Sequence, residues 1–245
     1  MRLATAQVTP WTLASLTSSI VVVAVTAGLV VYWPVGLPFV AAIGVVLALE
    51  MVIFRHVHAQ TTAENGPQPF TLATLITVLR GAAIVLLAGF VITGQPESVF
   101  VWLPALLFAV GTLFDAVDGA VARATDSASA FGGRLDIEID ALALLLGSLL
   151  AVRFGTAPAY FLAVGMARYV FVLGIAFRRV RKLSVHPLPP RQSRRMLGAM
   201  MMLVVFVLLT PAFGSQIGYW LASAAMIPFM LGFVRDWLLV TDTTV

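Results

Sequence analysis

Four of the five aspartates between positions 115 and 140 form two closely spaced pairs, in a chain of which only 11% of the residues are charged. Asp115 and Asp118 are three positions apart, and Asp136 and Asp140 are four positions apart. On an α-helix, either spacing places both side chains on one face. Hard divalent cations prefer oxygen ligands, so two such pairs facing a common space predict a site for Mg²⁺ or Mn²⁺. The same cation would bridge a diphosphate.

The apolar segments beside these aspartates argue against an ordinary acidic surface. Residues 105–114 and 141–152 are apolar runs, so the aspartates lie at or just inside a membrane boundary. Ionisable side chains at that depth are costly and are usually functional. A solvated acidic face, the usual explanation for carboxylates at helical spacing, is therefore the less favoured interpretation.

Composition predicts that the elements carrying these aspartates are membrane-spanning helices. Of the 245 residues, 60% are hydrophobic, and none is a cysteine that would allow disulfides or thiol chemistry. We expect an all-α fold, a polytopic transmembrane helical bundle of about eight helices. The apolar stretches that predict them are residues 12–33, 37–54, 72–93, 99–114, 137–152, 158–177, 196–211 and 217–234.

A more polar stretch from His56 to Pro69 is the predicted linker, because it contains a turn-forming Asn-Gly-Pro sequence. We therefore expect an N-terminal transmembrane helix pair over residues 1–58 and a six-helix core over residues 69–240. The first apolar run is longer than the core of a signal peptide and lacks a clear cleavage site, so we interpret it as a retained anchor.

The distribution of basic residues predicts the orientation in the membrane. The loops near 34–36, 94–98 and 212–216 contain no Lys or Arg, and Arg153 is the single basic residue at an outer helix end. Basic residues are enriched on the cytoplasmic side of membrane proteins. Both termini and the aspartate stretch are therefore expected to be cytoplasmic.

The aspartate stretch resembles the signature of the CDP-alcohol phosphotransferase family, the class I CDP-alcohol phosphatidyltransferases. That signature reads D-x2-D-G-x2-A-R-x8-G-x3-D-x3-D, and the resemblance covers about residues 69–240. Every fixed position is filled, by Asp115, Asp118, Gly119, Ala122, Arg123, Gly132, Asp136 and Asp140.

This resemblance implies an integral-membrane phospholipid synthase. Such an enzyme transfers a phosphatidyl-type or archaetidyl-type group from a CDP-linked lipid to an alcohol acceptor and releases CMP. It implies a metal-dependent reaction with Mg²⁺ or Mn²⁺, and a homodimer. Membrane lipids are the expected surroundings. No nucleic-acid partner is expected, because the membrane setting explains the basic residues.

The resemblance also implies roles for the aspartates. Asp115, Asp118 and Asp136 are expected to be the principal metal ligands. Asp140 lies one turn deeper on its helix, and it is expected to take the proton of the acceptor hydroxyl and to contact the metal as well.

The donor nucleotide is expected to contact small and cationic side chains of the same motif. Gly119 and Ala122 would let the nucleotide lie close to the helix. Arg123 would contact phosphate or pair with Asp126. The whole set expected on the donor side is Thr77, Arg80, Asp118, Gly119, Ala122, Arg123 and Gly132.

Thr77 and Arg80 belong to this set because they match a Thr and an Arg near the start of the family's first core helix. Thr74 stands where an Asn is common in the family. In the alternative interpretation, Thr77 bonds back to its own helix and Arg80 extends to the membrane interface.

A phosphate group on the acceptor is predicted from the basic residues of the C-terminal half. Arg168 lies inside an apolar helix, where a cation should pair with an anion. Guanidinium groups bind phosphate in a bidentate manner. The expected acceptor site consists of Arg168, Arg191, Ser193, Arg194 and Arg195. The alternatives are a buried ion pair for Arg168, and a basic loop that only fixes orientation and touches anionic lipids.

Glycerol phosphate and inositol phosphate both fit this cationic site, and serine or a plain polyol is a further alternative for the acceptor. Two other functions are also compatible with the sequence. In the first, a CDP-linked small alcohol is the donor and a diacylglycerol-type lipid is the acceptor. In the second, the chain is a non-enzymatic transporter or lipid-binding scaffold that binds ions at the acidic site.

Overall fold

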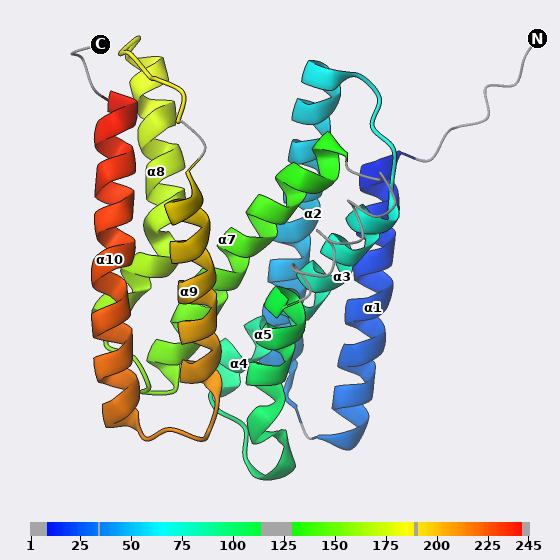
Figure 1. Ribbon diagram of the computed structural model, residues 1–245. Coiled ribbons are helices and arrows are strands. Elements are labelled where there is room, and N and C mark those ends of the chain that lie inside the picture. Colours follow the sequence, from blue (N-terminus) through cyan, green and yellow to red (C-terminus); the bar gives the residue numbers. More distant parts are fainter. Residues whose placement is uncertain (1–8, 34, 114–128, 189–190, 242–245) are drawn as a thin grey trace, which may run out of the picture. The chain divides into compact units, whose positions relative to one another are not determined.

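The computed structural model describes residues 9–33, 35–113, 129–188 and 191–241 and contains, within them, helices and connecting turns but no strands (Figure 1). The predicted all-α fold is therefore confirmed. Six of the described helical segments are long and apolar enough to cross a membrane. This agrees with the predicted polytopic membrane protein.

The described parts of the predicted apolar stretches fall on helices, because a membrane-spanning segment must satisfy its backbone hydrogen bonds internally. The first five helices are α1 (Pro10–Tyr32), α2 (Leu37–Asn65), α3 (Leu72–Leu86), α4 (Ala88–Thr93) and α5 (Leu103–Leu113), the last preceded by the 3₁₀ turn η1 (Ser98–Trp102). The others are α7 (Ala130–Arg153), η2 (Ala159–Phe161), α8 (Leu162–Val180), α9 (Gln192–Leu209) and α10 (Ser215–Thr241).

Several helices extend beyond their predicted apolar stretches, and the extensions of α2 and α7 bear on the predicted linker and on the site. The helix α2 continues to Asn65, so the predicted linker from His56 to Pro69 is wrong over most of its length. Its polar end contains good helix formers such as Ala63 and Glu64. Gly66, with a positive φ of 76°, caps the C-terminal end of the helix. Likewise α7 begins at Ala130, because its polar first turns are capped and packed.

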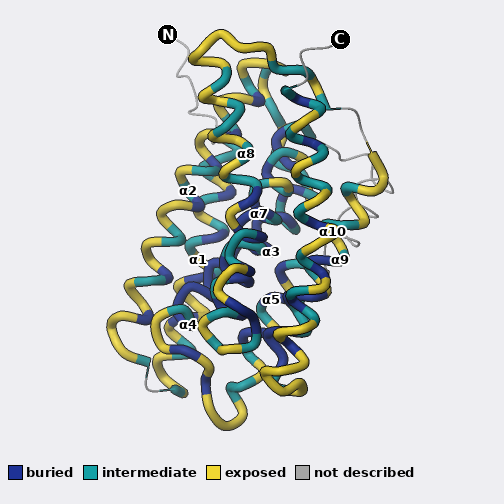
Figure 2. Tube along the Cα trace, turned by 90° about the vertical axis from the view of Figure 1, so that its left-hand side faces the viewer, coloured by how far each residue is buried: buried dark blue, intermediate teal, exposed yellow. Residues whose placement is uncertain are grey.

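The described residues form two compact units. The first contains residues of Met1–Thr93 and Leu106–Asp140. In it, α1 and α2 form an antiparallel hairpin that packs on α3 (Figure 1). Most of α3 is buried, whereas α1 and α2 expose apolar side chains along their length (Figure 2). These exposed apolar faces are what lipid-facing helices require.

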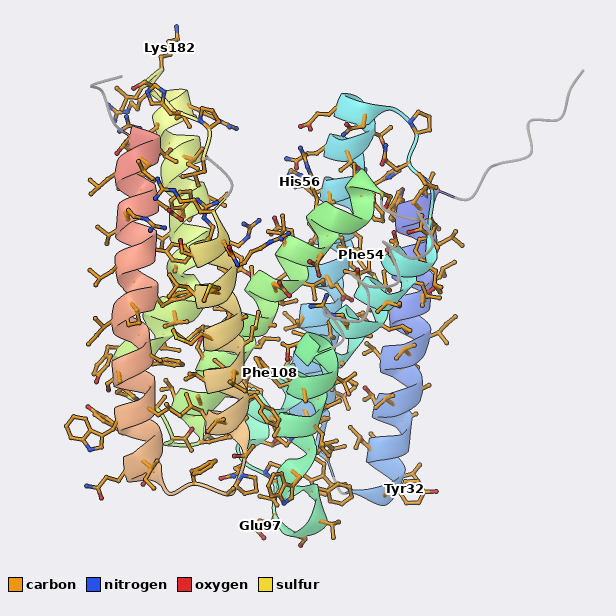
Figure 3. The ribbon with its side chains drawn as sticks, in the orientation of Figure 1. Tyr32, Phe54, His56, Glu97, Phe108 and Lys182 are labelled. Atoms are coloured by element: carbon orange, nitrogen blue, oxygen red, sulfur yellow. The ribbon has the colours of Figure 1, made fainter. Side chains whose placement is uncertain are left out.

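An apolar core joins α1, α2, α3 and the first half of α7. Its members are Ala14, Phe54, Val57, Val78, Phe131, Leu135 and Ile139. In Figure 3, Phe54 marks this buried face of α2, and His56 marks its exposed side. The core therefore holds the segment with Asp136 and Asp140 against α3.

The second unit contains Gly94–Ala105 and residues of Ala141–Val245. Here α10 packs along both α8 and α9. The loop after α8 is fastened to the end of α10, because the backbone N–H of His186 donates to the carbonyl of Val240 at 3.1 Å. Arg178 donates to the carbonyl of Ser184 at 3.0 Å. The proposed acceptor residues belong to this unit. The predicted division into residues 1–58 and 69–240 stays a prediction.

Candidate active site

The N-terminal ends of α3 and α7 lie side by side, and a contact between two hydroxyl groups joins them. Thr71 caps α3, and its hydroxyl accepts from the backbone N–H of Thr74 at 3.2 Å. Ser129 precedes α7, and its hydroxyl accepts from the N–H of Gly132 at 3.0 Å. The hydroxyls of Thr74 and Ser129 are 3.2 Å apart, which joins the two caps. Free N–H groups at helix starts need such partners.

Gly132 allows this close approach. A Cβ at this position would lie 2.8 Å from Oγ1 of Thr74 and 3.1 Å from Oγ of Ser129. A Cβ on the neighbouring Gly133 would have no other atom within 4 Å. The predicted donor-side role of Gly132 stays a prediction, and the structure gives it a packing role between α3 and α7.

Arg80 connects α3 to both aspartates of α7. Its guanidinium donates through Nη1 to Oδ1 of Asp136, and through Nη2 to Oδ1 of Asp140 at 2.8 Å. Its Nε donates to the carbonyl oxygen of Gly111 at 2.9 Å. The side chain of Arg80 is 1% exposed, compared with 29% for Asp136 and 37% for Asp140. The alternative in which Arg80 extends to the interface is therefore wrong.

This arrangement, which we call the Arg80 clamp (Arg80, Asp136 and Asp140), places the two carboxylates on one face of α7, as their spacing predicts. A planar guanidinium has donors in a fixed fork, so it holds both carboxylates in a defined geometry. Each carboxylate has a second oxygen, Oδ2, so pairing with Arg80 through Oδ1 is compatible with metal coordination.

The other half of the predicted metal site lies outside the described residues. It consists of Asp115 and Asp118, and the expected donor-side residues Gly119, Ala122 and Arg123 also lie outside the described residues. Among the residues that the structure describes, no group of three or more His, Cys, Asp or Glu side chains is placed to hold a metal ion. The described donors are carboxylates on one helical face, and these fit the oxygen preference of Mg²⁺ and Mn²⁺.

Thr74 and Thr77, the two threonines of α3, both have hydrogen-bond partners near the start of that helix. The hydroxyl of Thr77 donates to the carbonyl of Ala73 at 3.1 Å, as the alternative interpretation expects. Thr77 is 3% exposed and Thr74 is fully buried. A nucleotide contact by Thr77 stays a prediction.

One expected acceptor residue, Arg194, and a second cation, Arg235, meet around one acid of α10. Arg194 donates through Nε to Oδ2 of Asp236 at 2.7 Å, and Arg235 lies 3.4 Å from Oδ1 of the same carboxylate. Arg235 also donates to the hydroxyl of Ser193 at 3.4 Å. The basic loop has no acid of its own in the sequence, but the fold supplies Asp236. This cluster contains two cations and one anion, and so keeps a net positive charge.

The remaining expected acceptor residues are more separate. Arg191 and Arg195 are exposed at the start of α9, and Arg168 is half-buried on α8. Asp236 was not found from the sequence, because a single acid 42 positions from Arg194 carries no local signal. Ser129 has a recognisable signal, since Ser is a preferred residue directly before a helix.

The sequence profile of the CDP-alcohol phosphatidyltransferases matches residues 70–238. The chain belongs to this family. The resemblance seen in the aspartate motif is thereby confirmed, and the family supports both an enzyme and an integral membrane protein.

A curated relative is the archaetidylinositol phosphate synthase of Pyrococcus horikoshii. It is 42% identical over 83 residues, which are 34% of this chain and 39% of the relative. The match thus spans less than half of the relative's length. No solved structure matches the chain significantly.

Proposed function

We propose that this family member is a phospholipid synthase that transfers a phosphatidyl-type or archaetidyl-type group from a CDP-linked lipid to a phosphorylated alcohol, releasing CMP. The observation that carries the proposal is the Arg80 clamp. Family membership and the complete aspartate motif in the sequence support the same reaction.

A CDP-linked lipid has a negatively charged diphosphate that repels an incoming oxygen. A divalent cation bound by the aspartates would supply charge neutralisation for this diphosphate. Asp115, Asp118 and Asp136 would hold it, and Asp140 would also touch it. Within the described residues, Arg80 orients Asp136 and Asp140 toward this task.

Asp140 is the proposed general base. It takes the proton from the acceptor hydroxyl as that oxygen bonds to the lipid-side phosphorus. The bond between this phosphorus and the bridging oxygen breaks, and CMP leaves with that oxygen. Its neighbour Arg80 fixes the carboxylate at 2.8 Å, so the base has a defined direction.

The acceptor is proposed to be inositol phosphate or glycerol phosphate. The net positive cluster around Asp236 supports a phosphate group, and Arg168, Arg191 and Arg195 would add further cationic contacts. The name of the Pyrococcus relative supports an inositol phosphate acceptor and an archaetidyl donor. The active site and both termini are proposed to be cytoplasmic, and the enzyme is proposed to be a homodimer.

The decisive experiment is an acceptor screen with purified protein. CDP-linked ester and ether lipids are offered with inositol phosphate, glycerol phosphate and their unphosphorylated counterparts, and CMP and the lipid product are measured. CMP release is expected with a phosphorylated acceptor, is expected to stop with a chelator, and should return with Mg²⁺ or Mn²⁺. Equal use of inositol and inositol phosphate would contradict the phosphate-binding proposal. Turnover of a CDP-linked small alcohol with diacylglycerol would favour the reversed reaction.

A further inference from the structure

The N-terminal helix pair lies outside the stretch matched by the family profile, yet it buries an acid. Glu50 of α2 is 0% exposed, within a segment of mean hydropathy 2.5. Its Oε2 accepts a hydrogen bond from the hydroxyl of Ser18 on α1 at 2.5 Å, and Ser18 is also fully buried. Its Oε1 has no hydrogen-bond partner among the described residues. Such a group is costly in a membrane segment and usually has a function.

Packing alone does not explain an acid at this position. The neighbouring buried positions of α2 are apolar, among them Phe39, Ile43, Phe54 and Val57. Replacing buried charged groups by apolar residues of similar volume is often neutral or stabilising. A Leu or Met would therefore fill the same space at lower cost.

Glu50 contacts α3 at the residue that follows Arg80. A Cβ on Gly81 of α3 would overlap with Oε1 of Glu50 and would lie 2.8 Å from Cδ1 of Ile139. Gly81 follows Arg80 in the chain, and Ile139 precedes Asp140. The carboxyl group of Glu50 thus lies against the α3 backbone at Gly81, where the side chain of Ile139 from α7 also approaches.

We propose that Glu50 is a positioning residue that sets how closely α3 and α7 approach, and so fixes the geometry in which Arg80 holds Asp136 and Asp140. Ser18 holds the Glu50 side chain in place from α1. The N-terminal helix pair thereby becomes a support for the active site. This proposal rests on the proposed function, because it assigns the clamp to the metal and substrate site.

The first test compares Glu50→Ala with Glu50→Gln. Loss of the side chain should lower kcat by roughly ten- to hundredfold, because small displacements of reacting groups have effects of that size. Glu50→Gln keeps the volume and the hydrogen bond with Ser18, so it should restore most of the activity. The KM for the acceptor should not change, since the contacts of Glu50 are with α1 and α3 and not with the acceptor residues of α8 and α9.

A second readout needs no turnover. Mn²⁺ should raise the Tm of the unmutated protein, and this rise should shrink in Glu50→Ala and return in Glu50→Gln. The matched control is Phe39→Ala on the same helix, which removes aromatic contacts with Trp33 and Phe90. It should lower the Tm without Mn²⁺ but leave the Mn²⁺-dependent rise intact. If Glu50→Ala does not fold, Ser18→Ala replaces it. This variant should lower kcat and reduce the Mn²⁺-dependent rise in Tm, both by a smaller amount.

A double substitution tests the contact itself. Gly81→Ala should lower kcat because its Cβ meets Glu50 and Ile139, and combining it with Glu50→Ala should lower kcat by less than the product of the two separate losses. Strict additivity of the two changes would overturn the proposal. A normal kcat and a normal Mn²⁺-dependent rise in Tm in Glu50→Ala would also overturn it. The same holds if Phe39→Ala loses as much kcat and as much of the Mn²⁺-dependent rise as Glu50→Ala does. If the unmutated protein binds Mn²⁺ but releases no CMP, the proposed function fails, while the Mn²⁺ response still tests Glu50.

Discussion

A single buried guanidinium organises the described half of the candidate active site. Arg80 donates to acceptors on two other segments of the chain, namely Gly111, Asp136 and Asp140. A flexible ammonium group cannot reproduce this fixed fork. Charge and geometry at Arg80 are therefore separable by mutation.

Arg80→Lys should keep the positive charge but lose the fork. We expect kcat to fall by about ten- to hundredfold, corresponding to about 1.5–3 kcal/mol for a lost charge-assisted hydrogen bond. The matched control is Arg134→Lys, because Arg134 pairs with Glu64 on the surface and surface pairs contribute little. Equal activity of Arg80→Lys and Arg134→Lys would show that the clamp does not need a guanidinium.

Asp140→Asn separates the proposed base from the metal ligands. The amide still accepts a hydrogen bond from Arg80 but takes no proton at neutral pH, so turnover should be lost while CDP-lipid binding persists. Asp136→Asn should weaken metal binding as well. Binding of a labelled CDP-lipid and CMP release, measured on the same preparations, test both statements. Near-normal turnover by Asp140→Asn would mean that another group accepts the proton.

At the scale of elements, the site depends on how closely the start of α7 approaches α3. Where the two helices begin, hydroxyl caps and a glycine make the contact. A single methyl group at Gly132 should therefore disturb it.

Gly132→Ala should reduce activity and lower the Tm, because its Cβ meets the hydroxyls of Thr74 and Ser129. Gly133→Ala is a stringent control on the same helix. It has open space, and Ala is favoured over Gly in helices by about 0.8–1.0 kcal/mol, so the Tm should stay equal or rise. Similar behaviour of the two variants would contradict the close α3–α7 contact.

The cluster around Asp236 joins α9 to α10. Asp236→Asn should loosen Arg194 and raise the KM for a phosphorylated acceptor by about tenfold, with the KM for the CDP-lipid unchanged. Steady-state kinetics with inositol phosphate and with inositol provide the test. If Asp236→Asn changes the KM for inositol phosphate and for inositol equally, the cluster does not bind the phosphate group of the acceptor.

The sequence predicted the positions of the helices well, but it did not predict which side chains of different helices contact one another. The apolar stretches located the helices because a chain segment in contact with lipid must satisfy its own backbone hydrogen bonds, as a helix does. The extension of α2 to Asn65 and the early start of α7 were missed, since both ends are polar. The spacing of Asp136 and Asp140 predicted a shared face, but their pairing with Arg80 depends on packing between segments 56 and 60 positions apart.

At the scale of the whole molecule, the basic residues predict the orientation of the protein in the membrane. This orientation can be measured directly. The chain has no natural cysteine, so single cysteines are specific labels. Glu97 and Lys182 are exposed at opposite ends of the second unit (Figure 3). They therefore report on the two sides of the membrane.

We expect an impermeant maleimide to label Glu97→Cys in intact cells and to label Lys182→Cys only after the cells are opened. The physical reason is that Lys182 stands close in sequence to Arg178, Arg179 and Arg181, and such basic segments remain on the cytoplasmic side. Both variants should retain activity, because neither residue belongs to the proposed site. The reverse labelling pattern would place the basic loop outside.

The Arg80 clamp also bears on the order in which the protein is made. Translation produces α3 before α7, so Arg80 is synthesised 56 and 60 residues ahead of its two carboxylate partners. A guanidinium without its acids is costly in the hydrocarbon region. We therefore expect α3 to insert provisionally, shielded by the preceding α1–α2 hairpin, and to reach its final depth only after α7 has left the ribosome.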